Sequence, residues 1–278
     1  MRATSTRRFP LIHGAEEWSS SGPDSDVGVI VVHGFTTNPV STRPLGEAIA
    51  AHGYAVEVPR LPGHGTHWRD LARTRYTHWR SKVEATFDDL AARCRAVVLV
   101  GHSLGGTISL DIAARRCRTG RAKPLAGVAV INAQVLDRTD PLARANVVLQ
   151  HLIPAAPRQL AGLPPNDIAR PGADERAYMM VPAKAGYSVQ RELPRIRRSL
   201  PEITVPVLVA WSPQDHTVPP RNSRAIVKLV GTSDVGELRL DRCYHVAQLD
   251  HEADLLADRI VAFVARVTAS ESEASAGR

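Results

Sequence analysis

The chain has 278 residues, of which 44% are hydrophobic and 23% charged, a balance typical of a globular protein with a sizeable core. It carries 35 Lys and Arg against 28 Asp and Glu, a formal net charge of +7. The basic residues are scattered and accompany no zinc-finger spacing or RNA-binding signature, so we expect no nucleic-acid partner. Three cysteines argue against a disulfide framework and favour a reducing, cytoplasmic location.

The start of the chain is polar and basic. Residues 1–26 contain a loop-forming Ser-Ser-Ser-Gly-Pro run, so we expect an N-terminal extension ahead of the folded core. Residues 1–11 lack the apolar stretch of a signal peptide. No run approaches about 18 consecutive apolar residues, so we expect no transmembrane helix and at most transient contact with a membrane surface.

Apolar runs and helical segments alternate along the first half of the chain. Continuous apolar runs, typical of buried parallel strands, occupy residues 27–32, 54–58, 96–100 and 125–132. Helices are expected between and after them, at residues 41–52, 77–93 and 104–117. This order predicts an α/β fold with a mostly parallel, doubly wound sheet.

The alternation stops over residues 134–203, which hold nine prolines. We expect short helical stretches between these prolines, forming a helical cap inserted into the sheet domain. The pattern resumes with strands at 205–211 and 237–240 and with helices at 223–230 and 252–267. We therefore divide the chain into a core of residues 27–133 and 204–268, the cap, and a disordered tail at 269–278.

The most specific signal is a Gly-x-Ser-x-Gly motif, residues 101–105, at the end of the third strand. A strand before the motif and a helix after it are typical of the nucleophile elbow of α/β-hydrolases. Glycines on both sides let the backbone close around Ser103 in an unfavourable conformation. The Leu104 N–H then lies at a helix N-terminus, where it can bind a developing oxyanion. The alternative is an ordinary βα turn that carries a serine.

A serine nucleophile needs a general base and an orienting carboxylate, which follow it in this fold in the order acid, then histidine. Asp215 follows the strand at 205–211 and is the expected acid. His245 follows the strand at 237–240 and is the expected base. The residues that fit these places less well are Asp234, Asp241 and Asp250 for the acid and His216 and His251 for the base.

The loop after the first strand is expected to supply the second oxyanion donor. We assign this donor to the Phe35 N–H, with Leu104 N–H as its partner, and both residues to substrate binding. His33 is expected to make structural hydrogen bonds beneath the site, and His64 is expected to contribute little to catalysis. Cys243 is expected to be a small packed residue rather than a second nucleophile.

Four motifs carry a family resemblance: Val-Val-His-Gly-Phe-Thr at 31–36, Leu-Pro-Gly-His-Gly-Thr at 61–66, Asp-His-Thr-Val-Pro-Pro at 215–220, and Tyr-His-Val-Ala-x-Leu-Asp at 244–250. With them the chain resembles the bacterial monoacylglycerol lipases and related carboxylesterases of the α/β-hydrolase superfamily, over about residues 27–267. The resemblance implies an α/β-hydrolase with a small helical cap and a triad of Ser103, Asp215 and His245. It also implies hydrolysis of short- to medium-chain esters or monoacylglycerols.

We therefore expect a serine hydrolase that cleaves small lipophilic carboxylic esters through an acyl-enzyme. An acyltransferase with the same triad and a non-catalytic binding module are the alternatives. A serine at position 103 disfavours dehalogenases and epoxide hydrolases, which would carry aspartate there. Histidines and carboxylates are dispersed without metal-ligand spacing, so we expect no metal and no cofactor.

Overall fold

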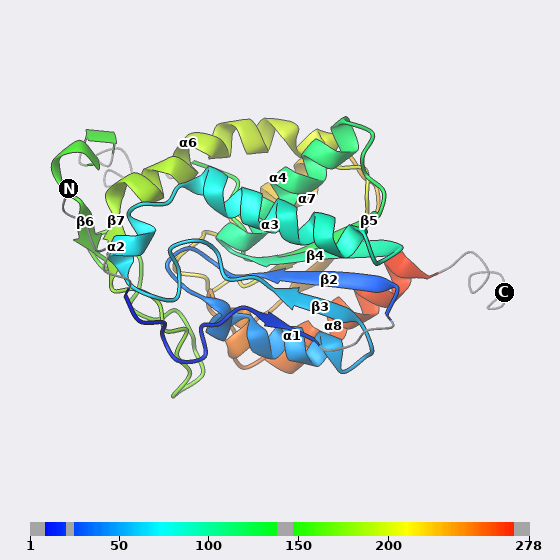
Figure 1. The fold of residues 1–278 in the computed structure, drawn as a ribbon, viewed down its shortest axis with the longest axis horizontal. Helices are drawn as coiled ribbons and strands as arrows, with labels where there is room; N and C mark the ends of the chain where they lie inside the picture. The colour runs from blue at the N-terminus through cyan, green and yellow to red at the C-terminus, as the bar shows by residue number, and fades with distance from the viewer. Residues whose placement is uncertain (1–8, 21–24, 138–146, 149, 270–278) are drawn as a thin grey trace, which may run out of the picture.

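The computed structural model describes residues 9–20, 25–137, 147–148 and 150–269. Its centre is a seven-stranded sheet in the order β1-β3-β2-β4-β5-β8-β9 (Figure 1). The strands are β1 (Trp18–Ser19), β2 (Val27–Val32), β3 (Ala55–Val58), β4 (Ala96–His102), β5 (Leu125–Ile131), β8 (Val207–Trp211) and β9 (Val235–Arg239). β1 pairs antiparallel with β3, and the other pairings are parallel. The expected mostly parallel α/β sheet is confirmed.

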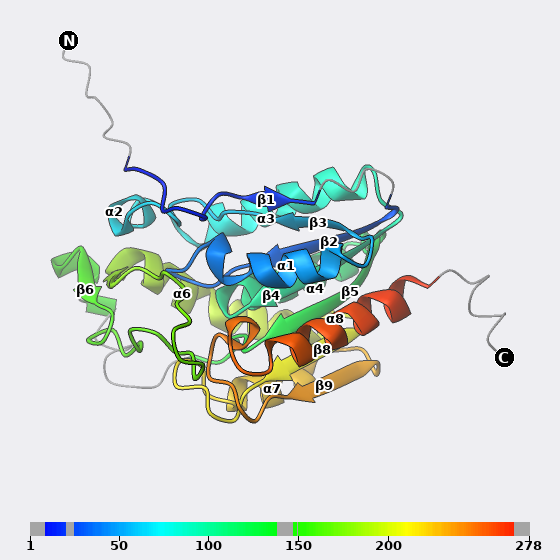
Figure 2. The ribbon, with the colours of Figure 1, turned by 90° about the horizontal axis from the view of Figure 1, so that it is seen from below.

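Helices cover both faces of the sheet (Figures 1 and 2). One face carries α1 (Arg43–Ala50) and α8 (Ala253–Thr268). The other carries α3 (Tyr76–Ala91), α4 (Leu104–Arg118), α6 (Ala183–Ser199) and α7 (Arg221–Leu229). Short helices complete the fold: η1 (Pro39–Ser41), α2 (Trp68–Leu71), η2 (Leu200–Glu202) and η3 (Ala247–Leu249).

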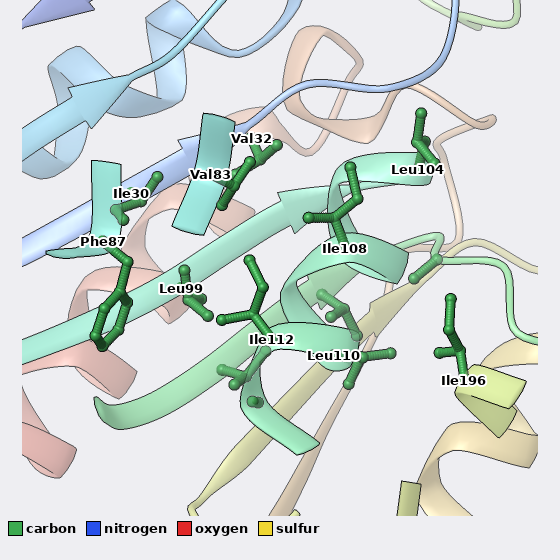
Figure 3. Close-up of a cluster of buried hydrophobic side chains, with 14 of the residues drawn as sticks. Ile30, Val32, Val83, Phe87, Leu99, Leu104, Ile108, Leu110, Ile112 and Ile196 are labelled. Carbon is green, nitrogen blue, oxygen red and sulfur yellow. The ribbon is translucent and has the colours of Figure 1, made fainter. Parts of the chain in front are cut away.

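Aliphatic side chains fill the two layers between sheet and helices. In Figure 3, Ile30 and Leu99 from the central strands face Phe87 of α3 and Ile108 of α4, and all four are fully buried. Burial of each such side chain stabilises the fold by about 1.5–3 kcal/mol. The buried β2 and β4 thus form a rigid base for the loops that leave their carboxyl ends.

The strands and helices predicted for the core lie within about two residues of their predicted bounds. β1 was not predicted, because a two-residue strand in a polar segment has no periodicity to detect. Trp18 pairs with Val58 on β3, so part of the predicted extension closes one edge of the sheet.

The expectation of short helical stretches between β5 and β8 is wrong. α6 is a 17-residue helix that continues through Pro194, and β6 (Ala155–Pro157) pairs antiparallel with β7 (Met180–Pro182). Leu193 and Ile196 of α6 are fully buried, and Ile196 packs within the hydrophobic core. This packing stabilises one continuous helix through Pro194, where the prolines had led us to expect shorter helices.

We propose residues 134–203, which include the long α6, as the cap. Its residues 138–146 and 149 lie outside the described part of the chain, as do residues 270–278 of the tail predicted to be disordered. Within the described residues, no helix is both long and apolar enough to cross a membrane.

Candidate active site

Ser103 occupies the sharp turn between β4 and α4. Its φ of 52° and ψ of −119° lie in a region that residues with a side chain rarely adopt. A Cβ on Gly101 would lie 2.4 Å from the Gly105 carbonyl, and one on Gly105 would lie 2.2 Å from the Val32 carbonyl oxygen. The turn therefore requires both glycines of the predicted motif.

The predicted acid and base are in contact. The Nδ1–H of His245 donates to Oδ2 of Asp215 over 2.8 Å, and both side chains are buried. The other carboxylate oxygen of Asp215 accepts from the N–H groups of Thr217 (2.8 Å) and Val218 (2.7 Å). These bonds fix the carboxylate and leave Nε2 of His245 as the ring nitrogen available for proton transfer.

Several charges act on His245. Burial disfavours its imidazolium form, but the carboxylates of Asp215, Asp167 and Glu175 outweigh burial and raise the pKa of His245 above its usual value. A histidine in this environment takes up a proton readily and can hold it during a reaction.

Ser103 and His245 line one cavity of about 380 Å³, together with Phe35 and Leu104. The structure thus brings the predicted serine, base and oxyanion donors to the same cavity. Much of the remaining wall is apolar and comes from the proposed cap: Ile153, Leu160, Leu163, Val181 and Val189. Such a wall suits a lipophilic ligand.

The loop that carries Phe35 is strained and is held by the proposed cap. Thr36 has a φ of 66°, which is unusual for a β-branched residue. Its carbonyl accepts from the Tyr178 N–H at 2.9 Å, and its hydroxyl accepts from Nη1 of Arg158 at 2.6 Å. The proposed cap therefore supports the backbone of the predicted oxyanion loop.

Arg158 also pairs with Glu175, and both side chains line the cavity. Their Nη2 and Oε1 atoms are 2.7 Å apart, and the side chains are 3% and 1% exposed. Oε2 of Glu175 is buried and has no hydrogen-bond partner among the described residues. Burial raises the pKa of Glu175, although Arg158 opposes the shift. Sequence reasoning missed this pair, because neither residue belongs to a recognisable motif.

Two further residues hold the backbone of His245. Its carbonyl oxygen accepts from Nε2 of His102 at 3.0 Å and from Nδ2 of Asn132 at 2.7 Å. Oδ1 of Asn132 accepts from the Ser212 N–H at 3.0 Å, so this side chain joins the loops that follow β8 and β9. Asn132 was missed, although its place directly after a buried strand is a signal that could have indicated it.

The four other histidines that were considered above lie where their predicted roles require. His33 is buried, with Nε2 accepting from the Leu61 N–H at 3.1 Å, and burial lowers the pKa of its ring to about 4. The buried His64 ring lies edge-on to His33 and Trp79. His251 is exposed, and His216 bonds to Asp167 rather than to Asp215.

The alternative acids and Cys243 have other partners. Asp234 and Asp241 form exposed ion pairs with arginines. Asp250 is buried and accepts from the Tyr244, Ala169 and Arg170 N–H groups, so it joins the His245 loop to the proposed cap. Cys243 is fully buried, and burial raises the pKa of its thiol to about 12. A thiol in this state is a packing residue, not a nucleophile.

Parallel strands that end in a strained serine turn beside an apolar cavity are the architecture of the α/β-hydrolase class of enzymes. Residues 29–259 match the model of the alpha/beta hydrolase family. The chain belongs to this family.

Similar proteins indicate which reaction, among those of the α/β-hydrolases, this chain catalyses. A thermostable monoacylglycerol lipase of Bacillus sp. (strain H-257) is 34% identical over 262 residues, which cover 94% of this chain and 98% of the relative. A carboxylesterase of Bacillus subtilis (strain 168) is 24% identical over 87% of this chain and 94% of its own. A solved structure of a metagenome-derived lipolytic enzyme superposes with a TM-score of 0.84 at 33% identity, covering 92% of this chain and 100% of that one. The chain is a carboxylic ester hydrolase.

Proposed function

We propose that the chain is a serine esterase that hydrolyses monoacylglycerols or related short- and medium-chain lipophilic esters. The observation that carries this proposal is the 2.8 Å bond between His245 and Asp215, formed where His245 and Ser103 line one apolar cavity. In this proposal Ser103 is the nucleophile, His245 the general base and Asp215 the residue that orients it.

The first half of the reaction forms an acyl-enzyme. Oγ of Ser103 attacks the ester carbonyl carbon while Nε2 of His245 takes the hydroxyl proton. The oxyanion that forms accepts hydrogen bonds from the Phe35 and Leu104 N–H groups. The tetrahedral intermediate then collapses, the bond from carbon to the alcohol oxygen breaks, and His245 protonates the departing alcohol.

The second half releases the acid. Water gives a proton to His245 and attacks the acyl carbon, and the Ser103–acyl bond breaks as His245 returns that proton to Oγ. The Asp215 carboxylate accepts from Nδ1–H of His245 and stabilises the imidazolium. The raised pKa of His245 favours this transient protonated state.

Two parts of the cavity lining, one apolar and one polar, support a monoacylglycerol as the substrate. The apolar cap residues Ile153, Leu160 and Leu163 suit the acyl chain. Oε2 of Glu175 is buried and has no hydrogen-bond partner in the described part of the chain, so it suits a glycerol hydroxyl, which would donate a hydrogen bond to it. The Bacillus sp. relative and a Mycolicibacterium smegmatis relative, 28% identical over 87% of this chain, are both named as monoacylglycerol lipases.

Turnover of a chain-length series of 4-nitrophenyl esters and monoacylglycerols by the wild type and by Ser103→Ala tests the proposal. We expect Ser103→Ala to lower kcat by several orders of magnitude. Ser233→Ala, at an exposed serine before β9, is the matched control and should keep full activity. Equal turnover by Ser103→Ala would refute the mechanism.

The same assay separates the alternatives. Acyl transfer predicts new esters when an alcohol is added, at the expense of free acid. A binding module predicts no turnover of any ester by the wild type. A glycerol subsite at Glu175 predicts that Glu175→Gln weakens turnover of monoacylglycerols more than that of 4-nitrophenyl esters, which lack the glycerol hydroxyls.

A further inference from the structure

Asp167, in the proposed cap, contacts the loop that follows Asp215. Its side chain is 2% exposed, and its carboxylate accepts three hydrogen bonds. The donors are the His216 N–H at 3.2 Å, Nδ1 of His216 at 2.8 Å and the Thr217 hydroxyl at 2.8 Å. His216 and Thr217 directly follow Asp215, so this carboxylate fixes the loop of the proposed catalytic acid.

The same residue also contacts the loop of the proposed base. The carbonyl oxygen of Asp167 accepts from the Val246 N–H at 3.1 Å, one residue after His245. In addition, the His216 ring packs edge-on against Tyr244, one residue before His245, with 4.5 Å between centroids. One cap residue therefore bonds to both loops, next to each member of the His245–Asp215 pair.

We propose that Asp167 is a positioning residue for ester hydrolysis: it fixes the loops of Asp215 and His245 relative to each other and adds a negative charge beside the base. This inference rests on the proposed triad. It makes the cap part of the catalytic geometry and not only a wall of the cavity.

The charge of Asp167 gives the proposal a signature that loose packing would not produce. Among the described residues, the ionisable groups that act most strongly on His245 include Asp215, Asp167, Glu175 and His102. Burial lowers the pKa of His102 well below its usual value, so that ring stays neutral. The carboxylates raise the pKa of His245, so the loss of one of them must lower it.

The experiment measures kcat, KM and the pH profile of kcat/KM for hydrolysis of a 4-nitrophenyl ester by Asp167→Asn, which keeps the shape of the side chain. We expect kcat to fall about tenfold through misplacement of the pair, with KM within about twofold. We expect the acid limb of the profile to move down by about half a pH unit. Asp241→Asn removes an exposed charge from the His245 loop and should leave kcat, KM and the acid limb unchanged.

A second variant covers the case in which Asp167→Asn does not fold. His216→Ala removes one hydrogen bond to Asp167 from a side chain that is 54% exposed and leaves the carboxylate in place. We expect kcat to fall about threefold, with no move of the acid limb to lower pH. Wild-type kcat in this variant would overturn the proposal.

The remaining outcomes are equally decisive. A kcat and acid limb for Asp167→Asn equal to those of Asp241→Asn would overturn the inference. A lower kcat with an unmoved limb would also overturn it, because that result indicates only a general loss of packing. Ser103→Ala, assayed alongside, separates these failures: if it keeps activity, the proposed triad itself is wrong.

Discussion

The buried pair of Arg158 and Glu175 allows a quantitative test of how the proposed cap is held. Arg158→Met keeps most of the side-chain volume but removes the cation that faces Glu175. The atoms of the pair are 2.7 Å apart, which corresponds to an attraction of about 6 kcal/mol at an effective dielectric constant of about 20. Part of this is recovered when the carboxyl takes up a proton, so we expect a loss of about 3–5 kcal/mol in the free energy of unfolding.

The loss should depend on pH in a defined direction. Without Arg158, the pKa of Glu175, already raised by burial, rises further above its value in the unfolded chain. The folded state then binds more protons than the unfolded state, so stability falls as pH rises between these two pKa values. The loss in Arg158→Met should therefore be larger at pH 8 than at pH 5.

Thermal and urea unfolding at both pH values measure this. At pH 8 we expect Tm to fall by roughly 10 °C. The double variant Arg158→Met/Glu175→Gln should recover much of the loss, since no unpaired buried charge remains. Arg191→Met, at an exposed arginine of α6 in the proposed cap, is the control and should cost less than about 0.5 kcal/mol. A single variant within about 1 kcal/mol of wild type at pH 8, or a double variant as unstable as the single, would refute the reasoning.

Two further predictions concern the proposed triad and the turn that carries Ser103. Because His245 must be neutral to accept a proton, its raised pKa predicts that kcat/KM falls as pH drops through a value above 6.5. Asp215→Asn should move this limb to lower pH and lower kcat by about four orders of magnitude, and a pH profile with an unchanged limb would contradict the assignment. Gly105→Ala places a Cβ 2.2 Å from the Val32 carbonyl oxygen and should abolish activity and lower Tm, as measured by ester turnover and thermal unfolding. Its control for stability is Gly186→Ala on α6, where the nearest neighbour is 3.8 Å away and Tm should hold or rise; equal Tm values for the two variants would contradict this view.

The core of the fold could be predicted because its signals are local. The buried runs at β2 and β4 are continuous and apolar, and the glycines around Ser103 mark a turn that other residues cannot make. The long α6 was missed for the opposite reason. Pro194 is a local helix-breaking signal, whereas the burial of Leu193 and Ile196 is a tertiary effect that sequence patterns do not show.

The candidate site shows the same contrast between local sequence signals and tertiary contacts. Ser103, Asp215 and His245 could be proposed because each follows a strand in the order that this fold requires. The residues that hold them could not, because Asn132, Asp167 and Arg158 act through hydrogen bonds to distant parts of the chain. A lone polar residue in a loop has no spacing to recognise, and only the fold brings it to its partner.

The positions of these contacts indicate two separate roles for residues of the proposed cap. Hydrogen bonds, which we call the polar ties, join it to the loops of the core. Arg158 bonds to Thr36, and Asp250 bonds to the N–H groups of Ala169 and Arg170. Asp167 bonds to the loops that carry Asp215 and His245. The apolar residues between the ties, such as Leu160 and Leu163, line the cavity. Substitutions among the apolar residues can therefore change the preferred acyl chain while the loops keep their geometry. Substitutions at the ties must instead lower kcat for every ester, whatever its chain length.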